Sequence, residues 1–150
     1  MNSLWLSNNK LINNNFIKEI DTSNTSNKTL LETDVCIVGA GIFGLTCAYY
    51  LSNLGYRVTV LEKDKIGEKT TGHTTAKITS QHGLFYSYLA NSYSQKFAQD
   101  YLEANEQAIK NIKNIIDKEK IKCDFEYKNS YVYTTKKEDL KFIKKEQKAI

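Results

Sequence analysis

The stretch DVCIVGAGIFGLTCAYYLSNLGYRVTVLE, residues 34–62, decides the fold of this chain. Its first five residues, 34–38, form an apolar, β-branched run that is typical of a strand buried on both faces of a sheet. A glycine-rich turn follows, and the residues 42–54 after it predict a helix. A second apolar run over 56–61 ends at Glu62. Strand, glycine turn, helix and strand in this order predict an α/β fold with two parallel strands.

The glycines of residues 39–44 follow the GxGxxG pattern of dinucleotide-binding βαβ units. Gly39 permits the tight turn out of the first strand, and Gly41 leaves the backbone open to a pyrophosphate. Gly44 allows the helix to pack close to the sheet. The free N–H groups and the positive dipole end at the start of the helix favour phosphate charge there.

Glu62 stands where the fingerprint places an acid that accepts hydrogen bonds from the ribose hydroxyls of an adenosine. An acid at this position disfavours a 2′-phosphate and therefore argues against NADP. FAD and NAD share the fingerprint, so the βαβ unit alone does not choose between them. A glycine turn in an α/β domain that binds no cofactor is the remaining alternative.

The rest of the chain predicts a loop, a long helix and the start of a second sheet. Residues 63–83 lack periodicity and are rich in small hydroxyl side chains. Residues 123–127 and 131–134 alternate with period two and predict a β-hairpin, and a final helix is expected to run to the end of the chain. Between loop and hairpin, apolar side chains recur at helical spacing and predict a core-facing stripe: Tyr93, Phe97, Tyr101, Ala104, Ala108, Ile112 and Ile115.

Composition excludes several classes of protein. The chain has 150 residues, enough for one domain of ordinary size, and its net charge of +4 is too mild to indicate a nucleic-acid partner. No apolar run approaches the roughly 18 residues of a membrane span, and the first residues lack a secretory pattern, so a cytoplasmic location is expected. Cys36, Cys47 and Cys123 lack metal-site spacing, so we expect reduced, buried thiols and no metal site.

Two further stretches carry a family resemblance. Residues 34–63 resemble the N-terminus of the D-amino-acid oxidase/glycine oxidase-like FAD-dependent oxidoreductases. The stretch TTGHTTAKITSQHG, residues 70–83, is similar to the subgroup whose full-length members carry a C-terminal Rieske [2Fe–2S] domain, and residues 131–135 fit that subgroup as well. The resemblance covers about residues 34–150.

The resemblance implies FAD as cofactor and a set of residues around it. Glu62 and Lys63 would lie at the adenosine ribose, and Thr74, Thr75 and Ala76 would approach the pyrophosphate and the flavin end. His73 would be a loop histidine beside the cofactor, with covalent attachment to the flavin as the alternative. The sequence identifies no catalytic residue. The pyrophosphate would be contacted by Gly39, Ala40, Gly41, Ile42, Phe43 and Gly44.

The implied organisation is a polar arm over 1–33, a Rossmann-like FAD-binding βαβ unit with its flavin-side loop over 34–83, and a partial substrate domain over 84–150. We expect an N-terminal, truncated portion of a flavin-dependent oxidoreductase that oxidises amines or amino acids by hydride transfer, inactive by itself. The alternatives are an NAD-binding dehydrogenase domain and a non-catalytic fragment. A redox partner or Rieske domain is expected only in full-length relatives, because these residues contain no Cys-x-His pair.

Overall fold

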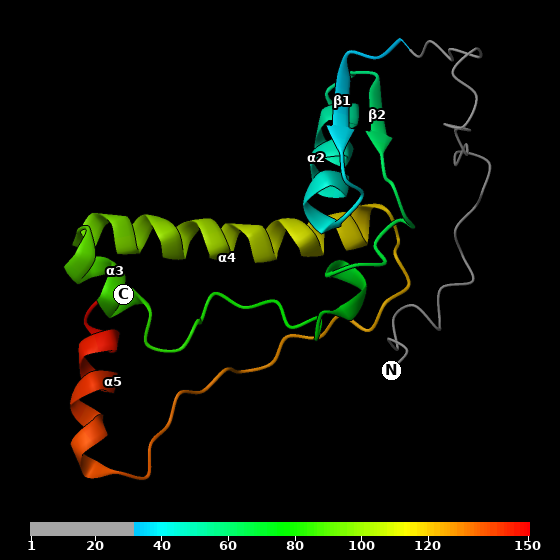
Figure 1. The fold of residues 1–150 in the computed structure, drawn as a ribbon. Helices are drawn as coiled ribbons and strands as arrows, with labels where there is room; N and C mark the ends of the chain where they lie inside the picture. Colours follow the sequence, from blue (N-terminus) through cyan, green and yellow to red (C-terminus); the bar gives the residue numbers. More distant parts are fainter. Residues whose placement is uncertain (1–31) are drawn as a thin grey trace. The chain divides into compact units, whose positions relative to one another are not determined.

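The computed structural model describes residues 32–150 and divides the chain into two compact units that meet between Ala76 and Lys77. The polar arm expected over 1–33 falls almost wholly outside the described residues. The first unit contains β1 (Val35–Val38), α2 (Ile42–Asn53), β2 (Val58–Leu61) and the 3₁₀ turn η2 (Thr71–His73). The second contains α3 (Tyr86–Ser92), α4 (Gln95–Lys118), the 3₁₀ turn η3 (Lys137–Asp139) and α5 (Leu140–Gln147) (Figure 1).

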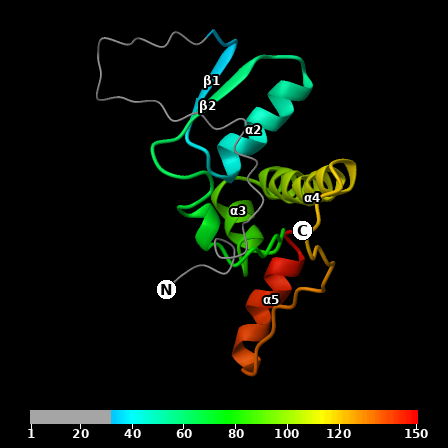
Figure 2. The same cartoon turned by 90° about the vertical axis from the view of Figure 1, so that its right-hand side faces the viewer.

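The first unit has the predicted order of strand, turn, helix and strand. β1 and β2 pair in parallel, with Val35 opposite Val58 and Val38 opposite Leu61. α2 packs against one face of this pair (Figures 1 and 2). Gly55 follows α2 with a φ of +91°, a left-handed conformation that ends a helix at little cost only for glycine.

The expectation that β1 is buried on both faces is wrong for the described residues. Val35 and Ile37 are half-buried, whereas Cys36 is exposed and Val38 is 86% exposed. The cause is that, among the described residues of this unit, α2 covers one face of the strand pair and the alternate side chains stay open. The thiols of Cys36 and Cys123 are free but exposed, so the prediction of buried thiols is also wrong for these two.

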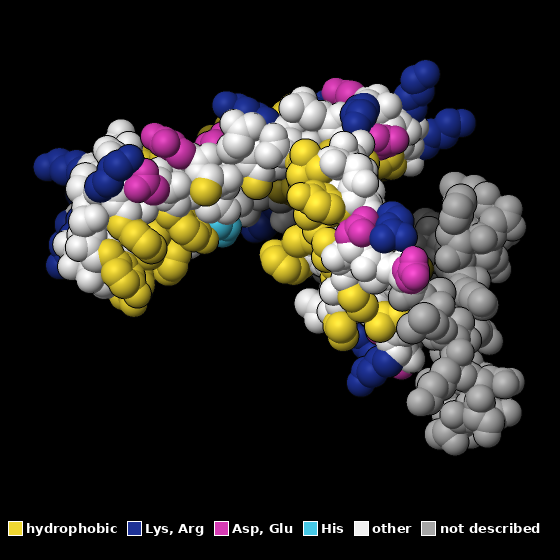
Figure 3. Space-filling model, turned by 90° about the horizontal axis from the view of Figure 1, so that it is seen from above, with side chains coloured by type: hydrophobic (Ala, Val, Ile, Leu, Met, Phe, Trp, Pro, Cys, Tyr) yellow, Lys and Arg dark blue, Asp and Glu magenta, His cyan; other side chains and the backbone are white. Residues whose placement is uncertain are grey.

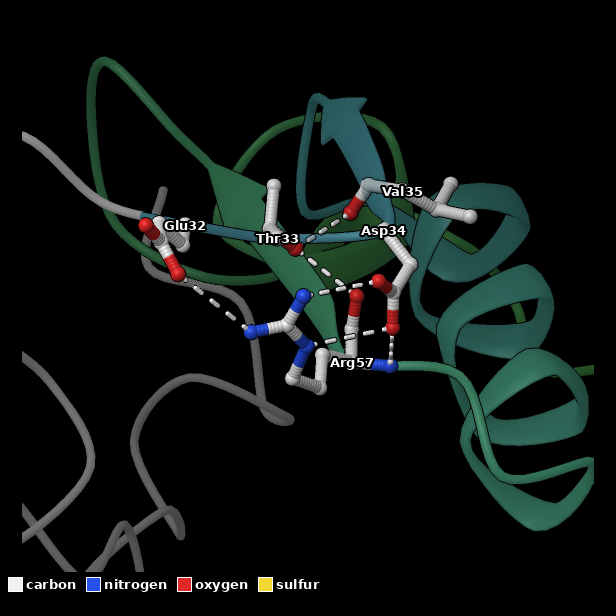
Figure 4. Close-up of polar contacts among 5 residues, drawn as sticks. All are labelled: Glu32, Thr33, Asp34, Val35 and Arg57. Carbon is white, nitrogen blue, oxygen red and sulfur yellow. Dashed lines mark hydrogen bonds and ion pairs between the residues drawn. The ribbon is translucent and has the colours of Figure 1, made fainter.

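A cluster of polar contacts fixes the register of the two strands where they begin (Figure 4). Oδ1 of Asp34 accepts from the Arg57 guanidinium at 2.9 Å, and Oδ2 accepts from the Arg57 backbone N–H at 2.8 Å. The Thr33 hydroxyl donates to the carbonyl oxygens of Val35 and Arg57, and Glu32 adds a 3.8 Å ion pair to Arg57. The hydrogen bonds from Arg57 hold the pKa of the Asp34 carboxyl below its usual value.

The second unit is built on the predicted long helix. The Ser94 side chain caps α4 by accepting a hydrogen bond from the Phe97 N–H at 3.0 Å. The predicted apolar stripe is a core face only in part, because Tyr93, Phe97, Ala104 and Ala108 are exposed and Tyr93 lies before α4. Ala98 is the buried alanine of this helix. Within this unit, Tyr101 of α4 meets His82, Phe85 and Tyr86 edge to face, from α3 and the segment before it.

A buried carboxylate fastens α5 to the start of α3. The oxygens of Glu146, which is 7% exposed, accept from the backbone N–H groups of Tyr86 and Ser87, both at 2.7 Å. These N–H groups lie in the first turn of α3 and have no partner within the helix. Glu146 therefore replaces the missing helical acceptors and orients α5 on α3.

The hairpin predicted at 123–134 is wrong, because the structure forms no strand there. The side-chain contacts there are local instead: Phe125 meets Tyr127 edge to face, and Lys128 pairs with Glu126. A period-two alternation of apolar and polar residues favours extended backbone, but it does not identify a neighbouring strand with which to pair. An isolated two-stranded hairpin is only marginally stable. The final helix also differs from expectation, since α5 ends at Gln147 rather than at Ile150.

Many large apolar side chains are exposed on the described residues, and Figure 3 shows them gathered in patches among charged side chains. Val38, Phe43, Tyr131 and Tyr133 are among the most exposed. No helix among residues 32–150 is both long enough and apolar enough to cross a membrane.

Replacement of Asp34 by Asn tests the contacts that fix the strand register. A carboxyl whose folded pKa is lowered stabilises the fold above its unfolded pKa of about 3.9, and this contribution is lost as the pH falls through the folded pKa. Urea unfolding should therefore show Asp34→Asn less stable than the unaltered chain near neutral pH, with the difference shrinking as the pH falls below the unfolded pKa of the carboxyl. Asp124→Asn, which alters an exposed carboxylate in the second unit, is the control; a difference that persists at acid pH would contradict this account.

Candidate functional site

The glycine turn joins β1 to α2 and is closed by backbone hydrogen bonds. The Gly39 N–H donates to the Leu61 carbonyl oxygen at 2.7 Å, which extends the pairing of the two strands into the turn. Gly39 itself has a φ of +105°, a conformation open to glycine and strained for other residues. The N–H of Leu45 then donates to the Gly41 carbonyl oxygen at 3.0 Å and begins the helix.

Gly44 and Gly41 differ in what surrounds them. A Cβ atom on Gly44 would lie 2.1 Å from the Gly39 carbonyl oxygen, so only glycine allows α2 to come this close to the turn. A Cβ on Gly41 would have the Thr71 hydroxyl oxygen as its nearest neighbour, at 3.4 Å, an ordinary contact. The open backbone at Gly41 and the close packing at Gly44 are the two features that the GxGxxG pattern predicts.

The carboxylate of Glu62 lies at the same turn. Its Oε2 accepts a hydrogen bond from the Ala40 N–H at 2.8 Å, and its Oε1 accepts from the Asp64 N–H at 3.0 Å. These backbone hydrogen bonds, that from Ala40 foremost, lower the pKa of Glu62 and favour its ionised form. A carboxylate has about four acceptor sites, so two bonds to the backbone leave capacity for ribose hydroxyls.

The loop after Glu62 is fastened to the turn at two points. The Gly67 N–H donates to the Ala40 carbonyl oxygen at 2.9 Å, and the Ile42 N–H, the first of α2, donates to the Thr71 hydroxyl oxygen at 2.9 Å. Thr71 is a residue that the sequence reasoning missed. In the sequence, Thr71 is one of several hydroxyl residues in this loop, and nothing distinguishes it from the others. No spacing rule identifies a residue of a distant loop that accepts a hydrogen bond from the start of a helix.

The predicted flavin-side residues follow Thr71 along the chain. Nδ1 of His73 lies 2.8 Å from the Lys69 carbonyl oxygen, which can only accept, so Nδ1 is the donor of this hydrogen bond. The Ala76 N–H donates to the Thr74 hydroxyl oxygen at 3.3 Å, and Ala76 has a left-handed φ of +56°. The side chain of Thr75 is exposed.

The other predicted site residues lie at the start of α2 and just after β2. Ile42 and Phe43 stand in the first turn of α2 and are 63% and 81% exposed, and Lys63 is exposed beyond the end of β2. Hydrogen bonds therefore bring together the turn, Glu62 and Thr71. Residues 73–76 continue from η2 in the same unit.

These features fit the adenosine diphosphate part of a dinucleotide. The backbone is accessible at Gly41, the N-terminal end of α2 lies beside it, and an ionised acid stands at the end of β2. Diphosphate charge suits a helix N-terminus, and ribose hydroxyls suit a carboxylate acceptor.

The comparisons with known proteins give a family. The model of the DAO family, described as FAD dependent oxidoreductase, matches residues 34–150. The matched range takes in both units from β1 onwards. No solved structure matches this chain.

Curated relatives carry oxidoreductase and iron–sulfur names. The chain is 39% identical over 118 residues to a putative Rieske 2Fe-2S iron-sulfur protein of Bacillus subtilis, covering 79% of this chain and 23% of that protein. It is 29% identical over 105 residues to the gamma-glutamylputrescine oxidoreductase of Escherichia coli, covering 70% and 24%. An L-amino-acid oxidase of Echis ocellatus is 43% identical over 51 residues, covering 33% and 10%. The matched part spans at most about a quarter of the length of these relatives.

Single alanine substitutions distinguish Gly44, which allows α2 to pack closely against the turn, from Gly41, which leaves the backbone accessible. Gly44→Ala forces a Cβ against a backbone oxygen and should destabilise the chain by about 1–3 kcal/mol or more. Gly41→Ala, at a φ of −80° and in ordinary contact, should change stability by less than about 0.5 kcal/mol. Urea unfolding measures both, and equal stability of the two variants would contradict the close approach described here.

Proposed function

The chain belongs to the DAO family of FAD-dependent oxidoreductases, and we propose that it forms the FAD-binding, N-terminal portion of such an enzyme. The observation that carries the proposal is the arrangement at the glycine turn. There, Glu62 is hydrogen-bonded to the Ala40 N–H beside a backbone that Gly41 leaves open. This arrangement suits a bound adenosine diphosphate in which charge meets the helix end and hydroxyls meet the acid.

The proposed contacts follow the order of the chain. The turn of residues 39–44 would hold the pyrophosphate, with Glu62 and Lys63 at the adenosine ribose. Residues 73–76 would approach the pyrophosphate and the flavin end, with His73 beside the cofactor. When bound, FAD supplies the hydride acceptor for the oxidation, and the protein supplies binding and orientation.

The side chains of this portion have three distinct tasks in the proposal. The ionised Glu62 orients the nucleotide by accepting hydroxyl hydrogen bonds with its unused lone pairs. The loop anchored through Gly67 and Thr71 keeps residues 73–76 near the turn. The hydrogen bond from Nδ1 of His73 to the Lys69 carbonyl oxygen orients the ring and leaves Nε2 for a contact with the cofactor.

We further propose an amine or amino acid as substrate of the whole enzyme. Two relatives support this class by their names, the gamma-glutamylputrescine oxidoreductase and the L-amino-acid oxidase. The putative Rieske relative supports a one-electron partner or domain in related proteins. Under this proposal, residues 34–83 bind the cofactor and residues 84–150 form part of the substrate domain.

Visible absorption after incubation with FAD and desalting tests the proposed function. We expect the chain to retain a flavin band that NAD in excess does not displace. Gly41→Glu should abolish the band, because the added side chain would occupy the proposed pyrophosphate position and its negative charge would repel the pyrophosphate. Ser52→Glu adds the same charge at the exposed far end of α2 and should retain it. A colourless unaltered chain, or displacement by NAD, would contradict the proposal.

Acid denaturation of the loaded chain distinguishes the two roles considered for His73. With His73 as a neighbour of the cofactor, all flavin should pass into the supernatant. Flavin that stays with the precipitated chain, but not with His73→Gln, would show covalent attachment instead.

A further inference from the structure

Four exposed lysines share one face of α5 and the residue that follows it. At about 100° per residue, positions 141, 144, 145 and 148 fall within an arc of about 100°. The opposite arc holds Ile143, which is half-buried, and Glu146, which is buried. We call this exposed surface the lysine face of α5, and its members are Lys141, Lys144, Lys145 and Lys148.

No acidic side chain of α5 balances the charge of the lysine face. The acid that α5 contains, Glu146, is 7% exposed, and its oxygens accept from the backbone N–H groups of Tyr86 and Ser87. Within residues 32–150, the four lysines take part in no ion pair. Most of their neighbours three and four positions away along the helix are again lysines, so like charges repel one another on this face.

Lysines of the long helix α4 are paired with acids instead. Lys96 forms an ion pair with Asp100, one helical turn further on. Lys113 forms the same kind of pair with Asp117. Such pairs are the usual way in which an exposed helix balances its charge. The high lysine content of the chain therefore does not by itself account for the lysine face, whose positive charge is left for a ligand outside α5.

The side chains at the borders of the lysine face favour a lipid surface as its ligand. Leu140 and Phe142 flank the lysines and are 45% and 49% exposed. The Lys141 ammonium lies 5.0 Å from the centre of the Phe142 ring. Lysines beside exposed leucine and phenylalanine are typical of helices that lie on anionic membranes. The face has no arginine, the residue that suits the paired recognition of carboxylates or base edges.

We propose that the lysine face of α5 binds the surface of an anionic lipid bilayer, without insertion of a membrane-spanning helix. Glu146 serves this contact indirectly, because its hydrogen bonds hold α5 on α3 with the lysines outward. Each lysine close to such a surface strengthens binding about fivefold. The contact does not involve FAD, so it goes beyond the proposed function and is tested independently of it.

The test is co-sedimentation of the full 150-residue chain with phosphatidylcholine vesicles, with or without about one third phosphatidylglycerol. We expect binding to the anionic vesicles only, weakened as the salt rises from about 0.05 M to about 0.5 M. Lys141→Gln combined with Lys145→Gln should weaken it about 25-fold. Lys96→Gln combined with Lys113→Gln removes the same charge from α4 and should stay within about twofold, and circular dichroism checks that both variants are folded.

Four results would overturn the proposal. The first is no binding of the unaltered chain to anionic vesicles. Equal binding to neutral vesicles would assign the contact to exposed apolar side chains, and equal loss in the two double variants would assign it to net charge. The last is binding of a poly-aspartate peptide through the lysine face without binding of vesicles, which would identify an acidic protein as the partner instead.

Discussion

The close approach of α2 to the Gly39 carbonyl oxygen, which only a glycine at position 44 allows, sets the geometry of the first unit. A Cβ there would lie 2.1 Å from that oxygen, so any larger residue would push the helix off the turn. The helix start would move with it, and the Ile42 N–H would lose the Thr71 hydroxyl. The absence of a side chain at Gly44 therefore maintains the geometry of the turn. The open backbone at Gly41 and the attachment of the loop through Thr71 both depend on it.

Two groups of polar contacts lie at the two ends of the strands of this unit and serve different purposes. At the start, Asp34 and Arg57 set the register. At the other end, Glu62 accepts from the Ala40 N–H, which supports the turn and favours the ionised carboxylate, and its remaining lone pairs are the ones that the proposed function assigns to the ribose. Such a shared role explains why an acid suits this position better than an amide, which accepts at one atom only.

Sequence patterns were sufficient to predict the secondary-structure elements that depend on residues close together in the sequence. The β-branched runs, the glycine spacing and the helical recurrence of apolar side chains give β1, β2, α2 and α4 with small shifts at their ends. Burial was less predictable, because it depends on how many elements cover a face: Val38 and Ala104 are exposed, since no described element of their own unit covers them. The hairpin at 123–134 failed for the same reason, since period-two alternation says nothing about a partner strand.

In the site, the sequence predicted the residues of the turn and the acid, because the fingerprint links them through one βαβ unit. It did not predict Thr71, whose partner Ile42 lies 29 residues away in the sequence. A contact of that separation depends on the path of an irregular loop. The family match over residues 34–150 then distinguishes FAD from NAD, which the βαβ geometry alone leaves open.

The most direct test of the central claim is a two-dimensional NMR titration of the ¹⁵N-labelled chain with FAD. The account predicts amide shift changes concentrated at residues 39–44, at Glu62 and Lys63, and at 70–76. Saturating changes at these positions would place the cofactor at the glycine turn. An unchanged spectrum, or changes confined to residues 95–118 and 137–147, would contradict the account.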